Sequence, residues 1–218
     1  WASCALSGAG HAALPDPCAV DKSVPEYKIP FHPSTYAHFV ARKDYRKTYD
    51  VYKDDTLLNR QPKKSRKIFV CLDEQRGQYL VDGLVAMDFP LSSGVKAYPT
   101  KTGDYAVISK KEDHTSNLYG KMYDAEGKCI NYNAESTDPV PEGGRFDGSP
   151  MPYWQRLTNA GLGLHVGKVR RHPVSHGCVR LPRNVAEILY RQTSIGTPVT
   201  IRKTPLPVPE AQKVPAVQ

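Results

Sequence analysis

The chain has 218 residues, 39% hydrophobic and 24% charged, and its 30 Lys and Arg against 22 Asp and Glu give a net charge of +8. This balance is typical of a folded chain rather than a disordered one, and the length suits one sizeable domain with extensions. No apolar run approaches the roughly 18 residues that span a bilayer, so we expect no membrane-spanning helix. Because Trp1 rather than Met begins the sequence, we expect a mature or truncated form.

The net positive charge suits an anionic partner, but the basic residues are scattered. One compact basic run lies at 63–67, and no nucleic-acid-binding motif surrounds it. We therefore expect a solvated basic surface and no nucleic-acid partner.

The first 65 residues form an N-terminal extension and linker by composition. Small residues and prolines predict an extended segment over 1–33, and residues 35–59 predict one short helix. Proline and charge over 61–65 indicate the linker itself.

Strand patterns begin after the linker. Residues 67–72 and 78–81 predict a hairpin, and 84–89 follows closely enough to extend it to a meander. Another strand is expected over 105–108. Residues 111–150 are polar and rich in Gly and Pro, so they predict a long loop insertion with at most a small hairpin near 121–132.

One helix is predicted near the end of the chain. Asn184 is a candidate N-cap, Glu187 completes a capping box, and Val185, Ile188 and Leu189 share one face. The helix ends before Gly196, and 197–201 predicts a final strand. Four prolines after residue 203 predict a disordered tail over 204–218. The domain core is thus mainly β and spans about 66–203.

The stretch from residue 163 to 182 carries the chemistry. His165 ends an apolar, β-like segment, and Ser175-His176-Gly177-Cys178 follows ten residues later. A glycine beside a cysteine lets a backbone amide approach a substrate oxygen, as an oxyanion hole requires. The pattern predicts an acyl-transfer enzyme with Cys178 as nucleophile and His165 as general base and acid.

These residues resemble the signature of the L,D-transpeptidase catalytic domain family. That signature is a His, a spacer, Ser/Thr-His-Gly-Cys, an apolar residue and then Asn or Arg, and His165 with residues 175–180 fill every position. Arg180 replaces the commoner Asn. Residues 151–154 resemble the strand that precedes the family's catalytic His, and 98–103 resemble its Pro-Thr-Pro-x-Gly turn, with Lys101 in place of the second Pro.

The resemblance covers about 66–203 and implies an L,D-transpeptidase-type β-sandwich with one helix after the Cys motif and a long loop insertion. It implies that Cys178 attacks the third residue of a peptidoglycan stem peptide and expels the terminal D-Ala. The acyl group then passes to an amine of a neighbouring stem or wall protein. Members acting as L,D-carboxypeptidases or cross-link hydrolases share this acyl-enzyme, and the sequence does not choose among them. Family members also accept carbapenems as acyl donors.

The resemblance also implies roles for individual residues, and no cofactor. The amides of Gly177 and Cys178 are candidate oxyanion donors, supported by Ser175 and His176 of the motif. Tyr153, His176 and Arg180 are candidates for binding and orienting the substrate or for shaping the pocket. Apart from the resemblance, we expect a backbone carbonyl to orient His165. The length of the insertion at 111–150, its Gly and Pro content and its position just before Tyr153 predict a lid over the Cys178 cleft.

The sequence also allows two other classes of function. His165, His172, His176 and Cys178 would be the four ligands of a zinc site, but Pro173 and the short spacers are not typical of ligand spacing. A wall-binding module without activity suits the charge, yet does not explain why both His165 and Cys178 are present.

The five cysteines are an odd number and none has Cys-x-x-Cys spacing. Trp1-Ala2-Ser3-Cys4 has the small residues of a lipoprotein cleavage site, so the protein would attach to a membrane only if Cys4 is lipidated. The alternatives are a Cys4–Cys18 disulfide or a free thiol. Cys71 is expected in the core and Cys129 in the insertion. A stem-peptide enzyme is expected to be exported to the periplasm or cell envelope, and to be a monomer.

Overall fold

The computed structural model describes residues 15–61 and 65–214, so Cys4 and its lipidation lie outside the described residues. The described chain divides into two compact units, one of residues 15–45 with 207–214 and one of residues 46–206. None of its helices is both long and apolar enough to cross a membrane.

The smaller unit packs around a short helix, α1 (Tyr36–Ala41), all six residues of which are buried. The Thr35 hydroxyl caps this helix by accepting the N–H of His38 at 3.2 Å. The unit also holds two 3₁₀ helices, Glu26–Lys28 and Glu210–Gln212. Val208 is buried, so the expectation of a disordered tail is wrong as far as residue 214. Apolar contacts, which the proline count does not reveal, order this segment.

The first sheet of the larger unit has the strand order β1-β4-β3-β2-β13-β5. Its strands are β1 (Tyr52–Lys53), β2 (Arg66–Cys71), β3 (Arg76–Val81), β4 (Leu84–Pro90), β5 (Gly103–Ala106) and β13 (Pro198–Arg202). The predicted meander is β2-β3-β4, and the predicted final strand is β13. All pairings are antiparallel except that of β13 with β2.

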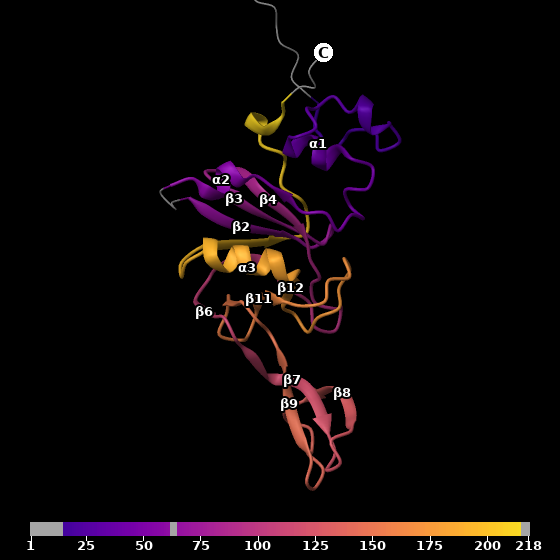
Figure 1. Ribbon diagram of the computed structural model, residues 1–218, viewed down its shortest axis with the longest axis vertical. Coiled ribbons are helices and arrows are strands. Elements are labelled where there is room, and N and C mark those ends of the chain that lie inside the picture. Colours follow the sequence, from indigo (N-terminus) through magenta and orange to yellow (C-terminus); the bar gives the residue numbers. More distant parts are fainter. Residues whose placement is uncertain (1–14, 62–64, 215–218) are drawn as a thin grey trace, which may run out of the picture. The chain divides into compact units, whose positions relative to one another are not determined.

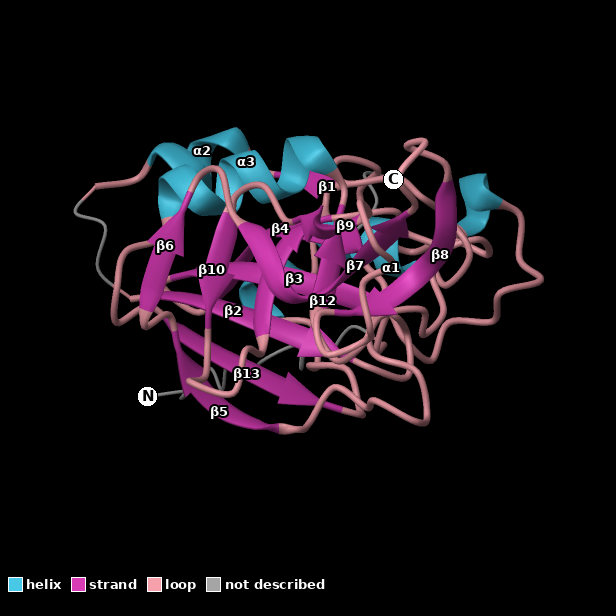
Figure 2. Cartoon of the chain, turned by 90° about the horizontal axis from the view of Figure 1, so that it is seen from below, coloured by secondary structure: helices cyan, strands magenta, loops and turns pink. Residues whose placement is uncertain are grey.

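The second sheet has the order β12-β11-β10-β6. Its strands are β6 (Ser109–Lys111), β10 (Trp154–Arg156), β11 (Gly163–Val166) and β12 (Val179–Leu181). One apolar core joins both sheets, with Ile68 and Tyr79 from the first and Leu164 and Val179 from the second. The neighbouring strands β3, β2 and β13 of the first sheet lie below the helix α3 (Arg183–Gln192) in the view of Figure 2. The predicted mainly β fold with one helix after the Cys motif is confirmed.

Helix α3 forms where the sequence predicts it but begins differently. Val185 and Leu189 are buried in the shared core, as the helical spacing indicates. The N-cap is Pro182 rather than Asn184, and no side chain caps the helix by a hydrogen bond. The predicted capping box is therefore wrong, because the strand β12 leads into the helix without an intervening turn that would place Asn184 at its start.

The insertion differs most from expectation. It contains a three-stranded antiparallel sheet of order β8-β7-β9, made of β7 (Thr115–Tyr123), β8 (Cys129–Glu135) and β9 (Arg145–Pro150). In Figure 1 this sheet extends away from the other strands of its unit. Few of its side chains are buried, so the apolar alternation that indicates a strand in the sequence is weak here. The insertion sheet is therefore defined by backbone hydrogen bonds between its strands rather than by an apolar core.

Residues 46–61 pack with the larger unit rather than with the rest of the N-terminal extension. β1 pairs with β4, and α2 (Asp55–Asn59) buries Leu57 and Leu58 in the shared core. Arg76, which forms a buried ion pair with Asp88, also binds residues 48–50. Its guanidinium donates to the carbonyls of Thr48 and Asp50 at 3.2 and 3.0 Å. A buried arginine needs such partners, and they come from outside its own strand.

Candidate active site

Cys178 and His165 are brought together by the pairing of β11 with β12. These strands run parallel, with Leu164 opposite Val179 and His165 opposite Arg180. Cys178 immediately precedes β12 and therefore follows the same register, opposite the start of β11. Residues two apart on a strand share a face, so the thiol and the imidazole face the same side of this sheet. Both line one cavity of about 310 Å³.

The Cys178 thiol lies against the backbone at the start of β11. Its Sγ donates to the carbonyl oxygen of Gly161 at 3.3 Å rather than to His165. Burial raises the pKa of the thiol, while the Gly163 amide and the Arg180 charge act in the opposite direction. The resting thiol is therefore protonated at neutral pH.

His165 is buried, with 6% of its surface exposed, and its ring is oriented by the backbone. Nδ1 lies 2.7 Å from the carbonyl oxygen of Val166. Because a carbonyl only accepts hydrogen bonds, Nδ1 carries the proton and Nε2 is left as the basic nitrogen. Burial lowers the pKa of the imidazole to about 4, the Val166 carbonyl raises it, and the charges of Arg180 and His114 lower it. The sequence-based expectation of a backbone carbonyl is confirmed.

The turn that carries Gly177 and Cys178 is anchored on both sides. The Ser175 hydroxyl donates to the Cys178 carbonyl at 2.5 Å and accepts the Gly177 N–H at 3.2 Å. The Thr100 hydroxyl donates to the Gly177 carbonyl at 2.6 Å. Gly177 has a φ of +110°, which L side chains rarely adopt. The motif glycine is required by this backbone, and Ser175 is a positioning residue rather than a group facing substrate.

An aromatic cluster covers the His176 side of the cavity. The His176 ring stacks on Tyr119 of β7 with centroids 4.3 Å apart, and Tyr98 lies 4.8 Å away on another side. Tyr119 lines the cavity together with His176. No local pattern in the sequence indicates a role for Tyr119, because it lies in the polar insertion. Residues of the insertion sheet therefore form part of the lining of the cavity that contains Cys178, and a lid role for this sheet stays a prediction.

Arg180 gives the cavity a positive charge. Its side chain packs on Gly167, where a Cβ would come within 2.8 Å of the arginine Cγ and Cδ. Lys168 also lines the cavity, and no Asp or Glu of the described chain does so. The guanidinium forms no ion pair with any described residue. An anionic group of a ligand is the partner that this cavity lacks.

Two sequence candidates lie elsewhere. Tyr153 does not line this cavity: its ring packs 5.6 Å from that of Tyr190 on α3, with the Arg183 guanidinium 6.0 Å from it. His172 is exposed, and its Nδ1 lies 3.3 Å from the Pro173 carbonyl oxygen. The four-ligand zinc alternative needs His172 beside His165, and this arrangement does not place it there.

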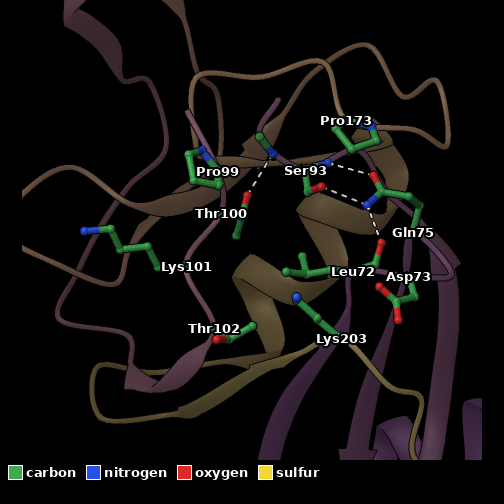
Figure 3. A pocket seen from close by; sticks show the side chains of 11 residues that line it. Leu72, Asp73, Gln75, Ser93, Pro99, Thr100, Lys101, Thr102, Pro173 and Lys203 are labelled. Carbon is green, nitrogen blue, oxygen red and sulfur yellow. Dashed lines mark hydrogen bonds between the residues drawn. The ribbon is translucent and has the colours of Figure 1, made fainter. Parts of the chain in front are cut away.

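A second hollow of about 450 Å³ is lined by Gly94, Thr100 and Pro173 among other residues, and neither Cys178 nor His165 lines it. In Figure 3 the Gln75 amide joins Ser93 to the Leu72 carbonyl along one wall. Thr100 lines the opposite wall and also holds Gly177. Thr100 in the wall of this hollow therefore stabilises the motif turn, whereas the smaller cavity contains the catalytic candidates Cys178 and His165.

The sequence matches the family model described as YkuD, L,D-transpeptidase catalytic domain, over residues 65–201. The chain belongs to the L,D-transpeptidase catalytic domain family. Members of this family are cysteine-dependent acyltransferases. The position of the predicted catalytic pair inside the matched region agrees with the sequence-based resemblance.

Among curated relatives of this L,D-transpeptidase domain, "Probable L,D-transpeptidase 3" of Mycobacterium tuberculosis is 31% identical over 121 residues. That match covers 52% of this chain and 38% of the relative, so the chain spans well under half of the relative's length. Among solved structures, an L,D-transpeptidase from Mycobacterium smegmatis has a TM-score of 0.48 at 21% identity, covering 63% of this chain and 58% of its own. The catalytic domain of the E. faecium L,D-transpeptidase has a TM-score of 0.46 at 28% identity, covering 64% and 98%.

The depressed pKa of His165 predicts a pH dependence of stability. The unfolded chain, with an ordinary histidine pKa near 6.5, binds more protons than the folded L,D-transpeptidase domain between about pH 6.5 and 4, so stability falls as pH falls through that window. We expect His165 alone to remove about 2 kcal/mol of unfolding free energy between pH 7 and pH 5. Urea unfolding at both pH values should show a decrease larger by this amount in the wild type than in His165→Gln. Equal decreases in both proteins would mean that the pKa of His165 is not depressed.

Proposed function

We propose that this domain transfers an acyl group from a peptidoglycan stem peptide through a thioester at Cys178. One observation carries the proposal: Cys178 and His165 face a single basic cavity from neighbouring strands of one sheet. Because peptidoglycan lies outside the cytoplasm, we also propose that the protein is exported to the cell envelope.

In the first half-reaction, Nε2 of His165 takes the thiol proton as Cys178 Sγ attacks the carbonyl of the third stem residue. The thiol and imidazole are both neutral at rest, because burial raises the first pKa and lowers the second. The nucleophile is therefore formed during attack, by general-base catalysis, rather than stored as an ion pair. When the C–N bond breaks, His165 returns the proton to the leaving D-Ala amine.

In the second half-reaction, an acceptor amine attacks the thioester. His165, neutral again, removes a proton from this amine, and as the C–S bond breaks it gives that proton to the leaving sulfur, which regenerates the Cys178 thiol and the neutral imidazole. Water in place of the amine gives hydrolysis by the same steps. The acceptor therefore decides between transpeptidation and L,D-carboxypeptidase activity.

The amides of the motif turn are the proposed oxyanion donors. The Gly177 N–H is directed at the Ser175 hydroxyl at 3.2 Å, which leaves Cys178 N–H as the principal candidate. A single such donor typically contributes about 2.7–4 kcal/mol to transition-state stabilisation. The hydrogen bonds of Ser175 and Thr100 fix the turn, so this donor needs no rearrangement during the reaction.

Arg180 is the proposed anchor for a carboxylate of the stem peptide. Its guanidinium lines the cavity without an ion-pair partner in the described chain, and burial lowers its pKa. A bound carboxylate would remove the free-energy penalty of this unpaired charge. Tyr153, packed on Tyr190 and outside this cavity, is not proposed to touch the reacting groups.

Product analysis tests the proposed function. Incubation with disaccharide-tetrapeptide and an acceptor stem is expected to release D-Ala and to give a cross-linked dimer by mass spectrometry. Disaccharide-tripeptide alone, with acceptor present, would instead identify an L,D-carboxypeptidase. Unchanged tetrapeptide with folded protein, in the presence and absence of acceptor, would contradict the proposal.

A further inference from the structure

An irregularity in the insertion sheet directs two side chains of β8 toward the catalytic cavity. In the pairing of β7 with β8, Gly120 is opposite Ala134 and Met122 is opposite Asn131. Tyr132 and Asn133 together therefore oppose the single residue Lys121, which is the geometry of a β-bulge. A regular strand would direct these two neighbours to opposite faces. Here both line the cavity that contains Cys178.

The bulge presents an aromatic ring that has no packing function of its own. Tyr132 is 75% exposed, the most exposed strand aromatic of the described chain. The Lys121 ammonium lies 5.6 Å from the centroid of the Tyr132 ring, and this cation–π contact orients the ring. The side-chain amide of Asn133 is exposed and makes no hydrogen bond with any described residue. Leaving such a ring in water with a single cation contact gains little for folding.

The lining of the cavity is chemically mixed. Arg180 and Lys168 make one part basic, where a carboxylate and the reacting carbonyl belong. Tyr132 and Asn133 make another part of the lining uncharged, with an aromatic face and a primary amide. An aromatic ring packs on the apolar C–H face of a sugar, and an amide pairs with an acetamido group. This combination fits an N-acetylated hexosamine better than it fits a charged peptide.

We propose that Tyr132 and Asn133 bind the N-acetylated sugar to which the donor stem peptide is attached. The inference rests on the proposed function, since it assigns a further part of the same substrate. Three extended residues separate the sugar from the reacting carbonyl, a span of roughly 10 Å. The sugar therefore lies outside the reacting centre but within reach of the insertion sheet, and the protein selects stems that are joined to glycan.

The kinetic test compares two donors, disaccharide-tetrapeptide and free tetrapeptide. Tyr132→Ala is expected to raise KM for the disaccharide donor about fivefold more than KM for the free peptide, with Asn133→Ala acting in the same direction. Ile130→Ala is the matched control, because Ile130 is 50% exposed on the same strand and does not line the cavity. Its ratio of the two KM values should equal that of the wild type. Equal increases for both donors in Tyr132→Ala would show contact with the peptide and overturn the proposal.

A binding test keeps the inference separate from catalysis. Cys178→Ala protein is titrated with the N-acetylglucosamine tetrasaccharide, and amide chemical shifts are followed by NMR. We expect saturable shifts in β7 and β8 that weaken about fivefold in Cys178→Ala/Tyr132→Ala and are unchanged in Cys178→Ala/Ile130→Ala. If neither donor reacts, the proposed function fails, and this titration alone decides the sugar site. Absence of saturable shifts, or equal affinity in all three proteins, would overturn it.

Discussion

Incubation with a carbapenem is expected to add one carbapenem mass to the protein, located by peptide mass spectrometry on Cys178. The strained lactam carbonyl requires only a thiol with a base and an oxyanion donor, so the natural acceptor need not be known. Attack by Sγ opens the ring and retains all atoms of the drug. Cys178→Ser should abolish the adduct, because a hydroxyl is a far weaker nucleophile than a thiol.

The other thiols supply the controls for this experiment. Burial raises the pKa of Cys71 to about 11 and its thiol donates to the Lys203 carbonyl, so it should not react. Cys129→Ser is the matched control, since Cys129 is partly exposed on β8 and outside the cavity. Its adduct should equal that of the wild type. A label on any cysteine other than Cys178, or no label on folded protein, would show that the nucleophile is assigned wrongly.

Substitution of His165 by Ala is expected to lower the rate of carbapenem acylation by about 10²–10⁴, the range for a general acid–base group. His165 is the buried imidazole whose Nδ1 proton is held by the Val166 carbonyl, which leaves Nε2 to accept the thiol proton. His172→Ala should change the rate less than about twofold, because His172 is exposed and outside the cavity. Stopped-flow or time-resolved mass spectrometry measures both.

Because His165 is buried, folding of the variant must be established separately. His165→Gln keeps a polar side chain of similar size and should also be slow, with the circular dichroism spectrum of the wild type. Restored acylation at high pH would support the base role, since the thiol then ionises without help. Equal losses from His165→Ala and His172→Ala would instead favour the four-ligand metal alternative.

Local patterns in the sequence were sufficient for the central elements. The apolar runs and turn residues of β2, β3 and β4 and the helical spacing of Val185 and Leu189 correspond to elements in the structure. These signals are local, because an apolar run or one apolar helix face can be recognised from neighbouring residues alone. The Ser175–Cys178 motif is likewise local: its glycine is dictated by a positive φ within the turn.

The tertiary structure decided everything that depends on distant residues. The parallel pairing of β11 with β12 places His165 and Cys178 on one face, and β7 brings Tyr119 onto His176. The insertion forms a sheet although its strands carry little apolar alternation, because backbone hydrogen bonds between strands leave no mark in the side-chain pattern.

The same reason explains where the structure departs from the sequence-based expectations. The resemblance makes Tyr153 a candidate for orienting the substrate or shaping the pocket, whereas its ring packs on Tyr190 of α3. The extension was expected to be separate, yet Arg76 and Asp88 hold residues 48–50 against the larger unit. The sequence by itself determined which residues carry the chemistry and the strands around them. Only the tertiary structure decided which distant side chains share the cavity. Such contacts depend on strand pairing and burial, and not on the spacing of apolar residues along one segment.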